Sequence, residues 1–136
     1  FHLLPGTVAT LTDVTANDGF TSGIMVTGAA LDGLRVTAVR NSEFGIFALA
    51  TSTVTLADST LDDNLTGLDM EMASGQLDAC TVSNNPFQGV AVRTGATLVS
   101  NASTWINNMP DVHPEGGPDY FATDGTFTCD EFLCID

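Results

Sequence analysis

A glycine followed by a branched apolar residue recurs every 22 residues along most of this chain. The copies are Gly23-Ile24, Gly45-Ile46, Gly67-Leu68 and Gly89-Val90, and Asp111-Val112 holds the next position. An asparagine or aspartate lies a few residues before each copy, at Asp18, Asn41, Asn64, Asn85 and Asn108. A fixed period of roughly 20 to 50 residues is typical of solenoids, in which each repeat packs only on its neighbours. The chain is therefore expected to fold as a solenoid.

The segments between these marks predict short β-strands. They are rich in Thr, Val, Ser and Leu, they alternate in polarity, as in Ser52 to Leu56, and none holds a 3.6-residue period. A leucine-rich repeat can have the same length, but it needs a regular leucine frame and a helical return segment. The return segments here are rich in Ser, Thr and Asp. Coils of three strands and three turns fit the pattern better.

The motif around each glycine resembles the repeats of a known family. Asparagine, then two or three residues, then glycine with Ile, Leu or Val, followed by a polar turn and a Thr/Ser-Val-x-Leu strand, resembles the coils of the pectate-lyase-like superfamily. The resemblance covers residues 7 to about 112. It implies an all-β, right-handed, single-stranded parallel β-helix of about five coils of about 22 residues. Such coils occur in lyases, hydrolases, tailspikes and adhesins, so the resemblance is specific for fold only.

The resemblance also gives structural roles to the repeated residues. In that family, asparagines stack at one turn of successive coils and bond through their amides, and the matching residues are Asn41, Asn64, Asn85 and Asn108. Gly23, Gly45, Gly67 and Gly89 are expected at a turn with positive φ, which glycine adopts readily.

Equivalent positions of stacked coils form columns through the interior, about 4.8 Å apart. One apolar column is expected to contain Ile24, Ile46, Leu68, Val90 and Val112. A second is expected to contain Val14, Val39, Leu61, Val82 and Trp105.

The repeat ends near residue 112, so we divide the chain into β-helix coils at 1–112 and an irregular C-terminal cap at 113–136. Cys129 and Cys134 flank four residues of this cap and are expected to form a disulfide, which places the protein outside the cell or at its surface. Cys80 is expected to be a buried thiol. Only Phe1 to Gly6 covers the N-terminal coil, so further coils or another subunit are expected there.

Charge excludes some partners. The chain has 17 acidic residues, three arginines and no lysine, and its formal net charge is −14. Nucleic acids and anionic membranes would be repelled, and no apolar run is long enough to span a membrane.

One outward face of the coils could hold a ligand. If Ile of each Gly-Ile pair points inward, the residues that point outward at successive coils include Phe47, Asp69, Glu71, Arg93 and His113. This mixture of an aromatic ring and charged groups suits a shallow groove for a sugar chain. The alternative is that Glu71 and Arg93 form an exposed ion pair of about 0–1 kcal/mol.

A complete active site is not expected. Asp69 and Glu71 lie about 6.5–7 Å apart as residues i and i+2 of a strand, which suits inverting glycoside hydrolysis or calcium binding but also any acidic strand. Asp62-Asp63 is similar to the paired aspartates of polygalacturonase-type relatives, but the His-bearing and Arg/Lys-bearing segments of that family are absent. We therefore assign neither catalytic residues nor a metal site.

Three classes of function remain. The preferred one is an extracellular β-helix module with a structural or binding role, part of a larger protein, for which the resemblance implies carbohydrate as the ligand. The second is a fragment of a polysaccharide lyase or glycoside hydrolase, and the third is an assembly subunit that stacks through its N-terminal coil. No cofactor is implied, and calcium at the acidic cap is the alternative.

Overall fold

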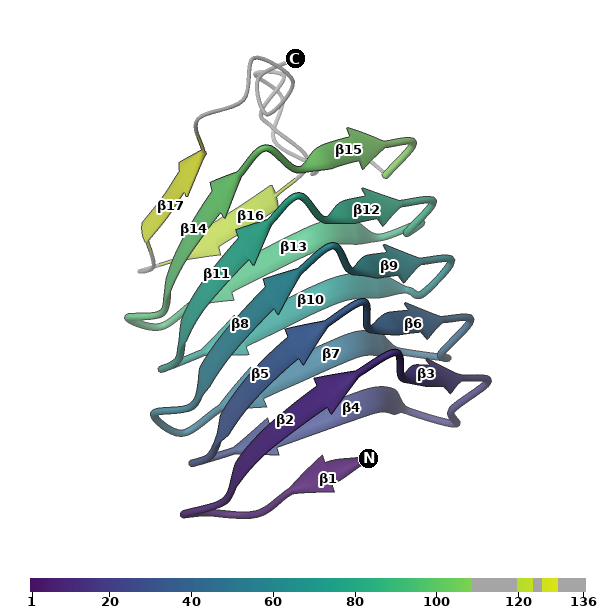
Figure 1. The fold of residues 1–136 in the computed structure, drawn as a ribbon. Helices are drawn as coiled ribbons and strands as arrows, with labels where there is room; N and C mark the ends of the chain where they lie inside the picture. The colour runs from purple at the N-terminus through teal and green to yellow at the C-terminus, as the bar shows by residue number, and fades with distance from the viewer. Residues whose placement is uncertain (109–119, 124–125, 130–136) are drawn as a thin grey trace.

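The structure is a computed structural model that describes residues 1–108, 120–123 and 126–129. The chain winds through successive coils, and each complete coil contributes one strand to each of three parallel sheets (Figure 1). None of the described residues lies in a helix, and this part of the chain accordingly has no helix able to cross a membrane. The prediction of an all-β parallel β-helix of about five coils is confirmed.

The three sheets run along the length of the solenoid. Sheet A consists of β1 (His2–Leu3), β4 (Ser22–Thr27), β7 (Phe44–Leu49), β10 (Thr66–Glu71), β13 (Gln88–Arg93) and β16 (Tyr120–Thr123). Sheet B consists of β2 (Val8–Thr12), β5 (Ala30–Leu34), β8 (Thr53–Ala57), β11 (Ser74–Asp78), β14 (Thr97–Asn101) and β17 (Thr126–Cys129). Sheet C consists of β3 (Thr15–Asn17), β6 (Thr37–Val39), β9 (Thr60–Asp62), β12 (Thr81–Ser83) and β15 (Thr104–Ile106).

The interior of sheet A is the predicted apolar column. Strand register places its members opposite one another, and each has 0% exposure: Ile24, Ile46, Leu68 and Val90. Val112 lies outside the described residues, and the residue in register with Val90 in the next strand is Tyr120.

The interior column of sheet C differs from the expected one. Its members are Ala16, Ala38, Leu61, Val82 and Trp105. Val39 is in register with Asp62 on the outward side, and Val14 precedes β3. The prediction of these two valines is wrong because alanine fills the interior position in the first two coils. Alanine is a weaker apolar signal than the valines nearby.

Four asparagines form a buried ladder at the turn between sheets C and A. The amide oxygen of Asn41 accepts from the backbone N–H of Gly19 at 2.9 Å. Each later amide oxygen accepts from the backbone N–H of the preceding member, at 3.0 Å from Asn41 to Asn64 and from Asn64 to Asn85, and at 3.2 Å from Asn85 to Asn108. Each amide nitrogen also donates to a backbone carbonyl of the preceding coil, such as Asn64 Nδ2 to Ala38 O at 3.0 Å. The ladder therefore satisfies backbone groups that the turn would leave unpaired.

The glycines that follow the ladder are needed for space and not for positive φ. Among the described residues the glycines with positive φ are Gly6, Gly28 and Gly95, which excludes the repeat glycines. A Cβ on Gly45 would lie 2.6 Å from the carbonyl oxygen of Gly67 and 2.8 Å from Asn64 Nδ2. The positive-φ expectation is therefore wrong, because these glycines lie in strands where the neighbouring coil and the ladder approach the backbone.

The coils continue beyond the expected boundary. β16 pairs with β13 and β17 pairs with β14, so these two segments are regular, in contrast to the irregular cap expected from residue 113. Cys129 belongs to β17, but its side chain and Cys134 lie outside the described residues, so their disulfide stays a prediction. Cys80 is a buried free thiol, as predicted.

Candidate ligand-binding face

The outer face of sheet A brings together four of the five residues predicted to bind a ligand. Asp69 of β10 is in register with Phe47 of β7, and Glu71 of β10 is in register with Arg93 of β13. The four side chains thus occupy three neighbouring coils on one face. His113 lies outside the described residues.

Arg93 pairs with Asp69. Its Nε donates to Asp69 Oδ1 at 3.1 Å, and its Nη2 lies 3.0 Å from Asp69 Oδ2. Arg93 thus makes a diagonal pair with Asp69, and the expected Glu71–Arg93 pair stays a prediction. A guanidinium can contact both oxygens of a carboxylate at once. The Asp69 side chain is only 5% exposed, and a buried carboxylate without a partner is costly, so Arg93 stabilises the protein by pairing with Asp69.

Burial dominates the electrostatics of Asp69. Loss of hydration raises the pKa of its carboxyl above the ordinary value of 3.8, and the nearby Glu71 charge acts in the same direction. The charge and hydrogen bond of Arg93 lower the pKa but do not cancel the effect of burial. Burial of the Asp69 carboxylate therefore costs free energy, and the pairing with Arg93 offsets only part of this cost.

An aromatic pair lies beside this ion pair. The rings of Phe44 and Phe47 are stacked, with centroids 4.8 Å apart and an interplanar angle of 25°. Strict alternation would put these residues on opposite sides of the strand. The pairing of β7 with β10 skips Gly45, so the alternation is interrupted there and both rings share one face. Sequence reasoning missed Phe44 for this reason.

A buried amide completes the face. Gln88 is in register with Thr66, which is in register with Phe44, and Gln88 is 4% exposed. Within the part of the chain that the structure describes, its Oε1 has no hydrogen-bond partner. A buried acceptor without a donor costs about 1–3 kcal/mol, so this oxygen destabilises the strand that carries it. Gln88 occupies the same register position as Thr66 and Phe44 in successive coils, and this position in the repeat could have identified it.

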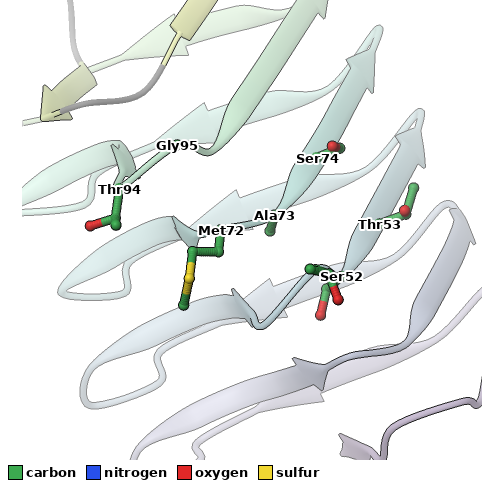
Figure 2. Close-up of a pocket in the computed structure, with 8 residues that line it drawn as sticks. Ser52, Thr53, Met72, Ala73, Ser74, Thr94 and Gly95 are labelled. Atoms are coloured by element: carbon green, nitrogen blue, oxygen red, sulfur yellow. The ribbon is translucent and has the colours of Figure 1, made fainter.

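A shallow groove adjoins the face at the turns between sheets A and B. Its volume is about 400 Å³, and Figure 2 shows Met72 and Thr94 extending from successive coils. The lining residues are Thr51, Ser52, Thr53, Met72, Ala73, Ser74, Thr94 and Gly95. Met72 and Thr94 directly follow Glu71 and Arg93, so the groove begins where the face ends. None of its residues was predicted from the sequence.

The other acidic candidates lie elsewhere. Asp62 belongs to sheet C, where its Oδ1 accepts from Ser83 Oγ at 2.6 Å and from Asn84 Nδ2 at 2.8 Å. Asp62 and Asp63 are thus separated from Asp69 and Glu71. Among residues 1–108 and the two later strands, no three His, Cys, Asp or Glu side chains are grouped so that they could hold a metal ion.

Comparison with known proteins agrees with this architecture. A family model described as right handed beta helix region matches residues 1–132. No curated protein and no solved structure matches the chain.

Proposed function

Since this chain belongs to the right-handed β-helix family, with its face of aromatic and charged groups on sheet A, we propose that it is a binding module for carbohydrate. The module is proposed to act outside the cell or at its surface, as part of a larger protein. The rigid stacking of coils supports the proposal, because a ligand site on regular strands needs little reordering on binding.

The proposal rests mainly on the stacked pair Phe44–Phe47 beside Asp69 and Arg93. A sugar ring offers an apolar C–H surface and a rim of hydroxyls. The rings suit the apolar surface, while the partly exposed Arg93 guanidinium and the Glu71 carboxylate offer hydrogen bonds to the rim. The adjoining groove gives room for a further part of an extended ligand.

A hydrolase is the second candidate, because the raised pKa of Asp69 beside Glu71 is a feature of carboxyl groups that act as general acids. Against it, Arg93 contacts both oxygens of Asp69, and this contact favours the ionised form that cannot donate a proton. We therefore favour binding without turnover.

A glycan array followed by calorimetric titration tests this proposal. Phe47→Ala should weaken glycan binding about tenfold, ~1.4 kcal/mol. Phe20→Ala is the matched control, because Phe20 is exposed on the turn before β4 and should leave the affinity unchanged. A reducing-end assay on the same glycans should show no cleavage. Absence of binding to any glycan contradicts the proposal, and cleavage abolished by Glu71→Gln supports the hydrolase.

A further inference from the structure

The charges around the stacked phenylalanines indicate which class of glycan the outer face of sheet A would bind. Glu71 is in register with Leu49, so it lies one strand over and two positions along from Phe47. The spacing of parallel strands puts the backbones of Phe47 and Glu71 about 8 Å apart. Both side chains are partly exposed. A sugar ring that lies on Phe47 can therefore place a substituent at the Glu71 carboxylate.

A second carboxylate lies on the other side of the aromatic pair. Glu43 directly precedes Phe44, at the turn before β7, and it is exposed. Glu71 ends β10, which runs parallel to β7. Along the strand direction, the two rings therefore lie between two acidic residues.

One arginine balances these charges on the face. Within β4, β7, β10 and β13, the charged residues are Asp69, Glu71 and Arg93. With Glu43, the region of the aromatic pair has three carboxylates and one guanidinium. The other two arginines of the chain pair with aspartates at the turns beside sheet C, and the chain has no lysine. The face therefore has a net negative charge.

The adjoining groove adds no positive charge. Its lining consists of serines, threonines, one methionine, one alanine and one glycine, which are all neutral. A glycan of uronic acids would thus be repelled along the face and would gain no compensating contact in the groove. A glycan with positive groups would be attracted.

We propose that the ligand of this face is a glycan of amino sugars, whose protonated amines pair with Glu71 while the sugar rings lie on Phe44 and Phe47. An ammonium group is attracted both by a carboxylate and by the face of an aromatic ring, and these two features are neighbours here. This inference rests on the carbohydrate-binding proposal and names the ligand class of the same site.

Two oligosaccharides that differ only at their amines test the inference, namely a glucosamine hexamer and its fully N-acetylated form. Calorimetric titration at mildly acidic pH, where the amines are protonated, should show about tenfold tighter binding of the glucosamine hexamer. The preference should shrink when the ionic strength rises from about 0.01 M to about 1 M, because salt screens exposed charges. Phe47→Ala should weaken the binding of both hexamers.

Two matched variants separate the face from the charge of the whole chain. Glu71→Gln and Asp32→Asn each remove one negative charge, and Asp32 is exposed on β5 of sheet B. Glu71→Gln should lower the affinity for the glucosamine hexamer about fivefold. It should leave the affinity for the acetylated hexamer unchanged, which also shows that the variant is folded. Asp32→Asn should change both affinities by less than about twofold.

The outcomes distinguish this inference from the carbohydrate-binding proposal. Binding of the acetylated hexamer as tightly as the glucosamine hexamer, or binding only of glycans without amines, overturns the inference and leaves carbohydrate binding in place. No loss of affinity in Glu71→Gln, or an equal loss in Asp32→Asn, also overturns it, because the amines would then not pair with Glu71. Absence of binding to any glycan contradicts the carbohydrate-binding proposal itself.

Discussion

At the residue scale, the asparagine ladder carries much of the specificity of the fold. Asn64 Oδ1 accepts from both the backbone N–H and the side-chain amide of Asn41, at 3.0 and 2.9 Å. Its own amide donates to Ala38 O of the preceding coil and to Asn85 Oδ1 of the next one, at 3.0 and 3.3 Å. One side chain thus satisfies polar groups of two neighbouring coils, in an interior where unpaired groups are costly.

Asn64→Leu should therefore lower the free energy of unfolding by about 1–3 kcal/mol for each buried group that it leaves unpaired. Urea denaturation followed by circular dichroism measures the change. Asn17→Leu is the control, because Asn17 is exposed on β3, and it should change stability by less than about 0.5 kcal/mol. Similar losses in both variants would show that the ladder does not have this role.

The carboxyl of Asp69 should make stability depend on pH. Its pKa is raised above 3.8, so the folded protein keeps this proton to a higher pH than the unfolded chain does. The contribution of Asp69 to stability is therefore present below pH 3.8 and is lost as the pH rises through the raised pKa. Asp69→Asn has no such titration.

Urea denaturation of the native sequence and of Asp69→Asn, at pH values from below 3.8 to above the raised pKa, gives the comparison. The free energy of unfolding of the native sequence, relative to Asp69→Asn, should fall with rising pH and then become constant. A relative stability that instead increases with pH would mean that Arg93 outweighs burial.

The three cysteines should differ in reactivity. Burial raises the pKa of the Cys80 thiol to about 11, so it should resist alkylation in the folded protein. If Cys129 and Cys134 form the predicted disulfide, alkylation in denaturant without reductant should label Cys80 alone, as measured by mass spectrometry. Labelling of all three would contradict the disulfide and remove the main support for an extracellular location.

At the element scale, the coils are held close together by the glycines of sheet A. A Cβ on Gly45 would meet the backbone carbonyl of Gly67, which cannot move without disturbing the next coil. A Cβ on Gly33 of β5 would instead meet the ends of the Leu56 and Val36 side chains, at 2.7 and 2.9 Å. The two sites are equally tight, but their neighbours differ in mobility.

Gly45→Ala should therefore destabilise the protein by about 1–3 kcal/mol, and Gly33→Ala by less, because side chains can shift into other rotamers. Chemical denaturation of both variants measures the difference. An equal or larger loss for Gly33→Ala would show that the backbone contact at Gly45 is easily relieved.

The sequence predicted the elements better than the contacts between them. The period of 22 identified the Ile24 column and the parallel coils, because repetition encodes register. It did not predict that Phe44 and Phe47 lie on the same face of β7. The alternation of side chains is interrupted at Gly45, where the next coil packs closely against the backbone. It also did not identify Asp69 as a partner of Arg93, because spacing along strands does not show which carboxylate is buried.

At the scale of the whole molecule, the solenoid should be unequally stable along its length. Each coil contacts only its neighbours, so the stability of a coil is the sum of its own terms and of one or two interfaces. The first coil has one interface and a partly exposed interior, while the coil that contains β8 lies between two others.

Hydrogen exchange followed by mass spectrometry should therefore show a gradient of protection in sheet B. Amides of β2 (Val8–Thr12) should exchange faster than those of β8 (Thr53–Ala57), although both strands have five residues and alternate in the same way. Local opening of the first coil exposes little additional apolar surface, whereas opening at β8 breaks two interfaces. Equal protection of the two strands would mean that all coils unfold as one cooperative unit.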